Sequence, residues 1–329
     1  MATSNGFVDL QASADFLGPG AIEINRYQSE IVDMLRRRLP FGQRIDQAPA
    51  TGQPSRYFEQ LGLPSANFVP PRTLTSTASQ PTRAERTVPL KALTAQINFS
   101  IFDVEVNAQQ GQFTYLEAKD LTDTVDSVLK THDQALWNGN DTSLTIPSTN
   151  QYFGVSGQII NAPQGTPGNQ TTVAATGSLI DSFKRQIAFM ASNLSYEVRP
   201  TASYGNPLGN DLFDKEAKTF QLYYNKVEIL PGVIVSGIPT QIGIIPLITD
   251  PSISVFGPAG GYAGQANSTY TQFIVTEDMI SYLWLTNPLP RVFQLGLQAN
   301  LASQYTVLKF GAVVVKGAPY AHAAMFFTR

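Results

Sequence analysis

The chain has 329 residues and a formal net charge of −3, and charged residues make up only 14% of it. Because soluble domains usually contain roughly 25% charged residues, we expect copies of the chain to cover much of its surface. A surface rich in Ser, Thr, Asn and Gln is the alternative explanation. The absence of cysteine excludes disulfides, thiol nucleophiles and thiolate metal ligands. The slightly acidic balance excludes an overall attraction to nucleic acid, so any such contact would be local.

The sequence predicts neither a secretory signal nor a membrane span. The first residues lack a basic start followed by an apolar run, and no stretch of about 18 uninterrupted apolar residues occurs. The most apolar run, Val227 to Ile248, is interrupted by three prolines and three glycines. We therefore expect this run to form short buried strands and turns.

An amphipathic helix is predicted over residues 21–39. Its apolar side is formed by Ile24, Tyr27, Ile31, Leu35 and Leu39. Three arginines, Arg36, Arg37 and Arg38, occupy the last turn before Pro40. They either compensate the helix dipole or form a basic cluster that contacts a polyanion.

Residues 47–81 are rich in Pro, Ser, Thr and Gln and show no sustained period. This composition favours an extended arm. So long an irregular segment is unusual inside a compact domain, whereas an arm lying across a neighbouring subunit would be free of that objection.

Residues 88–113 alternate apolar and polar side chains, which indicates an extended hairpin. The apolar positions begin with Leu93, Ala95, Ile97, Phe99 and Ile101. A long helix is predicted directly afterwards, over 114–137, because its apolar residues recur at steps of three and four and share one face. These residues are Leu121, Val125, Val128, Leu129, His132 and Leu136. Gly139 is expected to supply the left-handed turn that ends the helix.

The rest of the chain predicts an α+β order. Residues 141–176 are rich in loops, and a helix from Leu179 to Asn193 follows Ser178 as its N-cap. Short strands and turns are expected through 196–274, then a short helix at Thr276. The tail predicts strands at Val307–Val315 and Tyr320–Phe327. This order lacks the strict strand and helix alternation of a doubly wound sheet.

No catalytic or ligand-binding constellation stands out. The only histidines, His132 and His322, have no convincing partners and are expected to serve in packing. The segment Gly154-Val155-Ser156-Gly157 lacks the spacing of a nucleophile elbow. The glycine-rich residues 257–264 are not followed by the Lys-Ser or Lys-Thr of a phosphate loop. We therefore expect no enzyme activity, cofactor or metal.

One short motif and the order of elements carry a resemblance to a known family. The helix ends in Leu136-Trp137-Asn138-Gly139-Asn140-Asp141-Thr142, and Phe153-Gly154-Val155 follows after a loop. The chain resembles the major capsid proteins of tailed bacteriophages, which have the Hong Kong 97-like fold. The resemblance implies an N-terminal arm (1–81), an extended E-loop hairpin (82–113), a peripheral domain with a long spine helix (114–194), an axial domain (195–290) and C-terminal strands that return to the peripheral domain (291–329).

The resemblance also implies a function. Hexamers and pentamers of the chain would form the icosahedral shell of a virion, assembled in the host cytoplasm around double-stranded DNA bound without sequence specificity. Decoration, portal and scaffolding proteins would be partners, and no membrane would be involved. The candidate assembly or DNA-facing contacts are Arg36, Arg37, Arg38, Lys91, Phe99 and Phe102. Some relatives crosslink a lysine to an asparagine beside a glutamate; Lys91, Asn98 and Glu117 match by residue type but not by motif.

Two alternatives stay open. An encapsulin-like compartment shell would share the fold but hold cargo enzymes. From another class, a β-rich hydrolase or a carbohydrate-binding protein would remain a monomer at high concentration.

Overall fold

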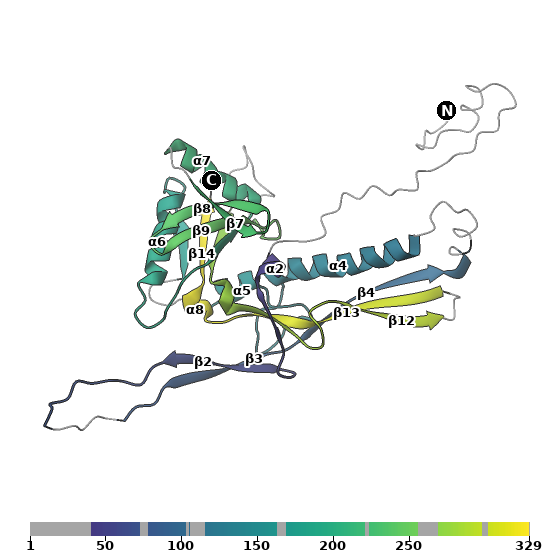
Figure 1. The fold of residues 1–329 in the computed structure, drawn as a ribbon, viewed down its shortest axis with the longest axis horizontal. Helices are drawn as coiled ribbons and strands as arrows, with labels where there is room; N and C mark the ends of the chain where they lie inside the picture. Colours follow the sequence, from purple (N-terminus) through teal and green to yellow (C-terminus); the bar gives the residue numbers. More distant parts are fainter. Residues whose placement is uncertain are drawn as a thin grey trace, which may run out of the picture.

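The computed structural model describes residues 41–72, 78–102, 105, 116–162, 169–220, 224–255, 269–297 and 302–328. These residues form an elongated molecule with three parts (Figure 1). A body built on a seven-stranded sheet lies at one end, and a flat layer with a five-stranded sheet and one long helix extends from it. A two-stranded hairpin projects from their junction. The mixture of sheets and helices confirms the α+β class.

The long helix α4 (Leu116–Asn138) confirms the helix predicted over 114–137. It lies along β4 (Lys91–Ser100) and β13 (Ala302–Val315) of the five-stranded sheet. Val128, His132, Leu136 and Trp137 are buried, whereas most of the earlier residues of the helix are only partly covered. The apolar face of α4 is therefore anchored to the core mainly through its second half.

The five-stranded sheet depends on β13. This strand pairs antiparallel with β4 along its length, and on its other side with β12 (Arg291–Leu297) and β11 (Ile280–Trp284). The short strand β1 (Asp46–Pro49) adds to β11 in parallel. Residues more than two hundred positions apart in sequence thus form one sheet.

The seven-stranded sheet forms the body, in the order β5-β14-β10-β6-β9-β8-β7. The strands are β5 (Gln170–Val173), β14 (Ala323–Thr328), β10 (Thr269–Val275), β6 (Ala202–Gly205), β9 (Gly243–Thr249), β8 (Val233–Thr240) and β7 (Asn225–Leu230). The apolar run Val227–Ile248 supplies β7, β8 and β9, as predicted. Its expected complete burial is wrong, because Val233, Ile234 and Ile244 are exposed.

Two helices pack on each other and on this sheet. α6 (Leu179–Ala191) begins at the predicted N-cap, where the Ser178 hydroxyl accepts a hydrogen bond from the Asp181 backbone N–H. α7 (Pro207–Thr219) has Asn206 as N-cap and proline at its first position, a favoured start. The prediction of strands and turns through 196–274 missed α7. Two further helices, α5 (Val155–Ile160) and α8 (Ala318–Ala321), are short.

A buried ion pair links the parts at their junction. Arg44, in the short helix α2 (Phe41–Arg44), donates through Nε and Nη2 to the two carboxylate oxygens of Glu277, at 2.6 and 2.7 Å. Glu277 lies in the 3-10 turn η1 (Glu277–Met279), the short helix predicted at Thr276. It also accepts from the Tyr204 hydroxyl in β6. Because these charged groups are paired, their burial is tolerated, and α2 is held against the body.

The predicted pairing of the hairpin is wrong. The expected hairpin was 82–113, but β3 (Thr82–Val88) pairs with β2 (Ser55–Gly62), which lies inside the predicted arm of 1–81. β4 instead pairs with β13. The alternation predicted over residues 88–113 was correct for β4, whereas β3 shows no alternation. The choice of partner depends on tertiary contacts that the local pattern does not contain.

The C-terminal strands divide between the sheets. β13 joins the five-stranded sheet, but β14 lies in the seven-stranded sheet between β5 and β10. β14 pairs in parallel with β5, which lies within residues 114–194, and the return of the C-terminal strands to the peripheral domain stays a prediction. The helix predicted over 21–39 and the glycine-rich residues 257–264 lie outside the described residues.

Candidate assembly surfaces

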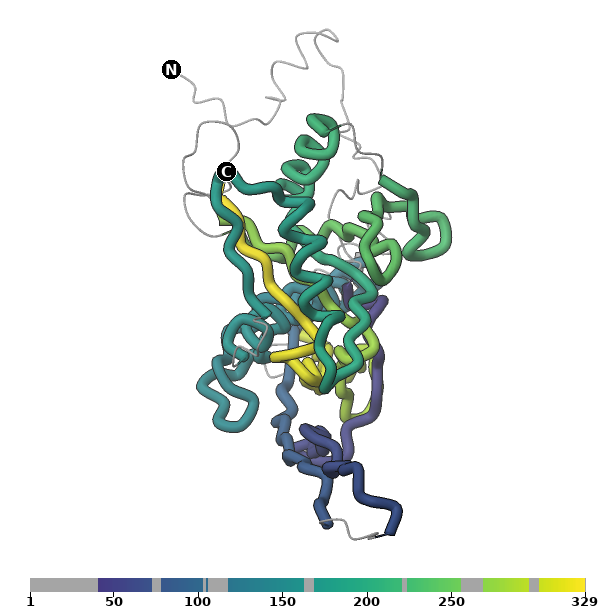
Figure 2. Tube along the Cα trace, turned by 90° about the vertical axis from the view of Figure 1, so that its left-hand side faces the viewer, coloured from purple at the N-terminus to yellow at the C-terminus, as the bar shows by residue number. Residues whose placement is uncertain are grey.

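The β2–β3 hairpin carries apolar side chains away from the rest of the chain. Among the described residues, β2 and β3 pair with each other and with no further strand. Figure 2 shows the hairpin projecting from the molecule on the side opposite the helices of the seven-stranded body. Phe58 is 71% exposed, Leu63 is 80% exposed and Phe68 is fully exposed. A lone two-stranded hairpin is only marginally stable in water, so these side chains suit a surface that a partner covers.

Side-chain contacts fix the base of the hairpin. Glu59 accepts a hydrogen bond from the backbone N–H of Gly317 at 3.0 Å, and the Tyr196 hydroxyl donates to the Leu61 carbonyl at 2.9 Å. The Tyr196 ring stacks on that of Tyr320, with centroids 4.2 Å apart. These contacts border a groove of about 620 Å³. The direction in which the hairpin leaves the body is therefore set by a few side chains rather than by a continuous sheet.

The end of α4 explains the sequence motif. Trp137 is buried, and its Nε1–H donates to the Asp250 carboxylate at 3.0 Å. A Cβ at Gly139 would collide with the backbone carbonyl of Tyr152, and one at Gly154 with the carbonyl of Trp137. The predicted left-handed turn at Gly139 is wrong, since Gly139 is absent from the glycines with positive φ that the described residues contain. Glycine is required here because two backbone segments approach closely.

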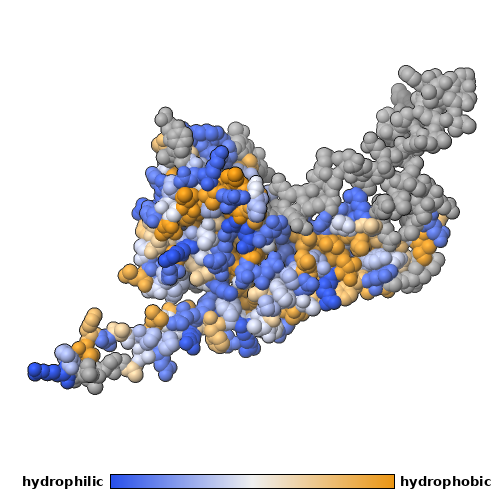
Figure 3. Space-filling model, viewed as in Figure 1, coloured by the Kyte–Doolittle hydropathy of each residue, from blue (hydrophilic) through white to orange (hydrophobic). Residues whose placement is uncertain are grey.

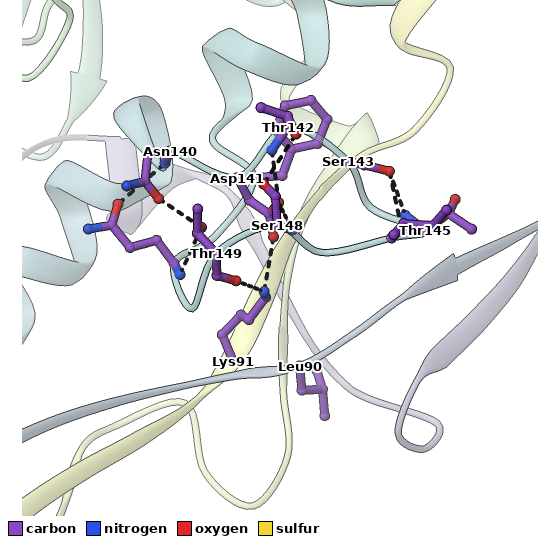
Figure 4. A network of polar contacts seen from close by, with 12 residues as sticks. Leu90, Lys91, Asn140, Asp141, Thr142, Ser143, Thr145, Ser148 and Thr149 are labelled. Atoms are coloured by element: carbon purple, nitrogen blue, oxygen red, sulfur yellow. Dashed lines mark hydrogen bonds and ion pairs between the residues drawn. The ribbon is translucent and has the colours of Figure 1, made fainter.

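A second contact ties the loop after α4 to the sheet (Figure 4). Lys91 of β4 donates to Asp141 at 2.9 Å and to the Thr149 carbonyl. The other Asp141 oxygen accepts from the Thr142 N–H and from the N–H and hydroxyl of Ser148, at 2.8 to 3.0 Å. Burial alone would raise the pKa of the Asp141 carboxyl, but these hydrogen bonds outweigh burial and lower the pKa below its ordinary value.

The edge strand β12 forms a further apolar surface. Within the part of the chain that the structure describes, it pairs with β13 alone. Exposed apolar side chains on β12 and the turn before it are Leu285, Leu289, Val292, Phe293 and Leu295. In Figure 3, apolar residues gather over the flat layer that contains this sheet. An exposed apolar edge strand promotes association with another chain unless a partner covers it.

Comparisons with known proteins identify the fold but not a close relative. No family model and no curated protein matches the chain. The capsid of a native GTA particle superposes with a TM-score of 0.64 at 12% identity, over 96% of this chain and 98% of that chain. The structure named Microbacterium phage Oxtober96 superposes with a TM-score of 0.61 at 12% identity, over 97% of this chain and all of that chain. The chain has the Hong Kong 97-like fold.

A compartment protein has the same fold. The holo-SrpI encapsulin complex from Synechococcus elongatus superposes with a TM-score of 0.57 at 12% identity, over 97% of this chain and 95% of that chain. Capsids and an encapsulin thus match this Hong Kong 97-like chain at similar identity, so fold similarity does not choose between them.

The predicted contact residues occupy different environments in this Hong Kong 97-like subunit. Arg36, Arg37 and Arg38 lie outside the described residues. Lys91 is only 12% exposed and is committed to Asp141. Phe99 is partly buried and packs edge-to-face on Tyr305, with ring centroids 5.8 Å apart. Phe102 is 72% exposed, and its role as an assembly contact stays a prediction.

Sequence reasoning missed the apolar residues of the hairpin and of β12. Phe58 lies in Arg56-Tyr57-Phe58-Glu59-Gln60-Leu61, where apolar and polar residues come in pairs rather than alternate, so the sequence gives no strand signal there. Leu63 and Phe68 follow it without any periodic signal. Their exposure depends on the absence of a covering layer, which no local pattern reports.

Both histidines serve in packing, as predicted. His132 lies beside Tyr282, with ring centroids 4.5 Å apart, and burial followed by the Lys309 charge lowers its pKa. His322 accepts from the Thr276 N–H through Nδ1 and donates through Nε2 to the Lys316 carbonyl. Burial lowers the pKa of His322 to about 4. Both rings are therefore neutral at pH 7.

The described residues contain no cluster of three or more His, Asp or Glu side chains that could hold a metal ion. In the part of the chain that the structure describes, no helix has the length and hydrophobicity to cross a membrane.

Proposed function

We propose that the chain is a major capsid protein, whose hexamers and pentamers form an icosahedral shell around double-stranded DNA. The observation that carries this proposal is the β2–β3 hairpin, which holds Phe58, Leu63 and Phe68 in solvent. A folded monomer gains nothing from such a projection, whereas a shell subunit can bury it on a neighbour. Burial of apolar area contributes about 25 cal/mol per Å², and the many contacts of one subunit add up.

The hairpin of residues 55–88 is the proposed counterpart of the E-loop. In this assignment the peripheral domain comprises α4 and the five-stranded sheet, and the axial domain comprises the seven-stranded sheet with α6 and α7. The exposed apolar surface of β12 is the proposed landing site for a neighbouring hairpin, because both surfaces are apolar and both lie open on the subunit. Portal, decoration and scaffolding proteins are partners proposed on the same likeness to capsids, as is the location in a virion.

Electron microscopy of the purified chain tests the proposal. We expect closed shells from the natural sequence, and only unassembled subunits or isolated capsomers from a Phe58→Asp, Phe68→Asp double variant. The matched control, Phe58→Leu with Phe68→Leu, keeps both positions apolar and should still assemble. Circular dichroism checks that each variant is folded, which we expect because both side chains are exposed. A natural chain that remains monomeric at high concentration would contradict the proposal.

An encapsulin-like compartment is the second candidate, because an encapsulin complex matches over nearly the whole chain. Particle content separates the two functions. Long nuclease-protected DNA inside particles isolated from their source supports a capsid. Particles that lack DNA and contain a bound enzyme support a compartment.

A further inference from the structure

An apolar strip lies on one face of the β7–β8–β9 ribbon. Gly237 sits at its centre, where an added Cβ would lie 2.6 Å from Ile244 and 2.8 Å from Val227. Val235 pairs with Val227 and therefore shares its face, and Val233 lies two residues earlier on the same strand. We call Val227, Val233, Val235 and Ile244 the β8 strip.

The β8 strip is open to solvent. Val233 is 45% exposed and Ile244 is 48% exposed, although both are β-branched residues that usually pack against a partner. In Figure 3, apolar residues gather over the part of the body in which Figure 1 labels β7, β8 and β9. Contiguous exposed apolar surface of this kind indicates a site of interaction.

The first described residues, Phe41–Arg44, lie beside one end of the strip. Arg44 of α2 donates through Nη1 to the Ile229 carbonyl, near the turn that joins β7 to β8. The Ile229 side chain packs against the same core cluster that contains Phe41. Val233 follows directly after that turn. Arg44 of α2 therefore lies close to the Val233 end of the strip.

The sequence before Phe41 carries a matching apolar pattern. In the helix predicted over 21–39, Ile31, Leu35 and Leu39 recur every four residues. At a rise of about 1.5 Å per residue this spacing is about 6 Å. Alternate residues on one face of a strand are about 6.6 to 6.8 Å apart. Three successive helical residues can therefore meet three successive same-face positions along β8, namely Val233, Val235 and Gly237.

We propose that residues 21–39 dock as a helix on the β8 strip of their own subunit. Leu39 then lies toward Val233, Leu35 toward Val235, and Ile31 toward Gly237, beside the Ile244 side chain. The subunit's own segment is favoured over one from a second copy because only Pro40 separates it from the anchored Phe41. Such a tether gives the segment a high effective concentration at the strip. The proposal does not depend on the function proposed above.

Disulfide trapping tests the proposal cleanly because the natural chain has no cysteine. Under oxidising conditions, a Leu35→Cys, Val235→Cys variant should form a disulfide within one chain. Two control pairs change one face each. Asp33→Cys with Val235→Cys moves the thiol to the other side of the predicted helix, and Leu35→Cys with Ser236→Cys moves it to the other face of β8.

The readout is a non-reducing gel with peptide mass spectrometry, on unassembled subunits and on particles. We expect an intrachain yield at least about tenfold above both controls, as the tether argument requires. Disulfide-linked dimers in a mixture of the two single-cysteine chains, without an intrachain product in the double variant, would assign the strip to a second copy and overturn the proposal. Equal yields from test and control pairs would also overturn it. Shell formation is scored separately, so failure of one proposal does not disguise failure of the other.

Discussion

The ion pair between Lys91 and Asp141 should contribute far more to the free energy of unfolding than an exposed ion pair with a similar N···O distance. The Asp141 side chain is 1% exposed, so a Lys91→Met variant leaves a covered carboxylate without its cation. Removing one partner of a buried pair costs about 3–5 kcal/mol. Asp141 keeps three hydrogen bonds from Thr142 and Ser148, which reduces the loss. We therefore expect the free energy of unfolding to fall by about 2 kcal/mol, the range of one hydrogen bond to a charged group.

Urea denaturation of unassembled subunits measures this loss, and the chain offers a matched control. Arg199 and Glu197 form an ion pair at 2.8 Å, nearly the same distance, but both side chains are largely exposed. Exposed pairs contribute little, so Arg199→Met should leave the denaturation midpoint unchanged. If the two variants behaved alike, burial would not be the cause of the difference, and the reasoning would be refuted.

Three further predictions concern the same core. Gly139→Ala should lower the free energy of unfolding by at least about 3 kcal/mol in urea denaturation, because the new methyl group meets backbone rather than a movable side chain. The control is Gly52→Ala, whose Cβ would lie 3.7 Å from its nearest neighbour and which should cost much less. Similar losses in the two variants would contradict this prediction. Trp137→Phe should cost about 1–3 kcal/mol by the same assay, because the Asp250 carboxylate loses a buried donor; an unchanged midpoint would contradict it. Because burial lowers the pKa of His322 to about 4, protons bind the unfolded state preferentially between pH 6.5 and about 4. In the natural chain, the free energy of unfolding should decrease as the pH is lowered from 6.5 to about 4. The decrease should be less steep in His322→Gln, and parallel pH profiles would contradict this.

The sequence predicted the elements that carry their own signals. α4 and α6 were found because apolar residues repeat along one face, and because Ser178 caps the second helix. α7 was missed because its first turns, from Pro207 to Asp211, are rich in proline, glycine and polar residues and resemble a loop until packing is known. Tertiary contacts override such weak propensity.

Strand partners could not be predicted for a different reason. β4 shows the expected alternation but pairs with a strand about two hundred residues later, and β3 pairs with β2 across a long proline-rich connection. Nothing in one strand specifies which distant strand will complete its hydrogen bonds. The packing roles of His132 and His322 could be predicted because the chain supplies so few titratable partners. The open surfaces at Phe58 and on β12 could not, since exposure is a property of the whole fold.

The division of the last strands between the two sheets has a consequence for the timing of synthesis. β13 is the central pairing partner of β4, β11 and β12, and β14 sits inside the seven-stranded sheet. Neither sheet can close until residues 302–328 have left the ribosome, although nearly all of their partner strands are translated earlier. A nascent chain therefore cannot expose a completely folded surface to other copies of the chain. The order of the strands along the chain thus disfavours premature association during translation.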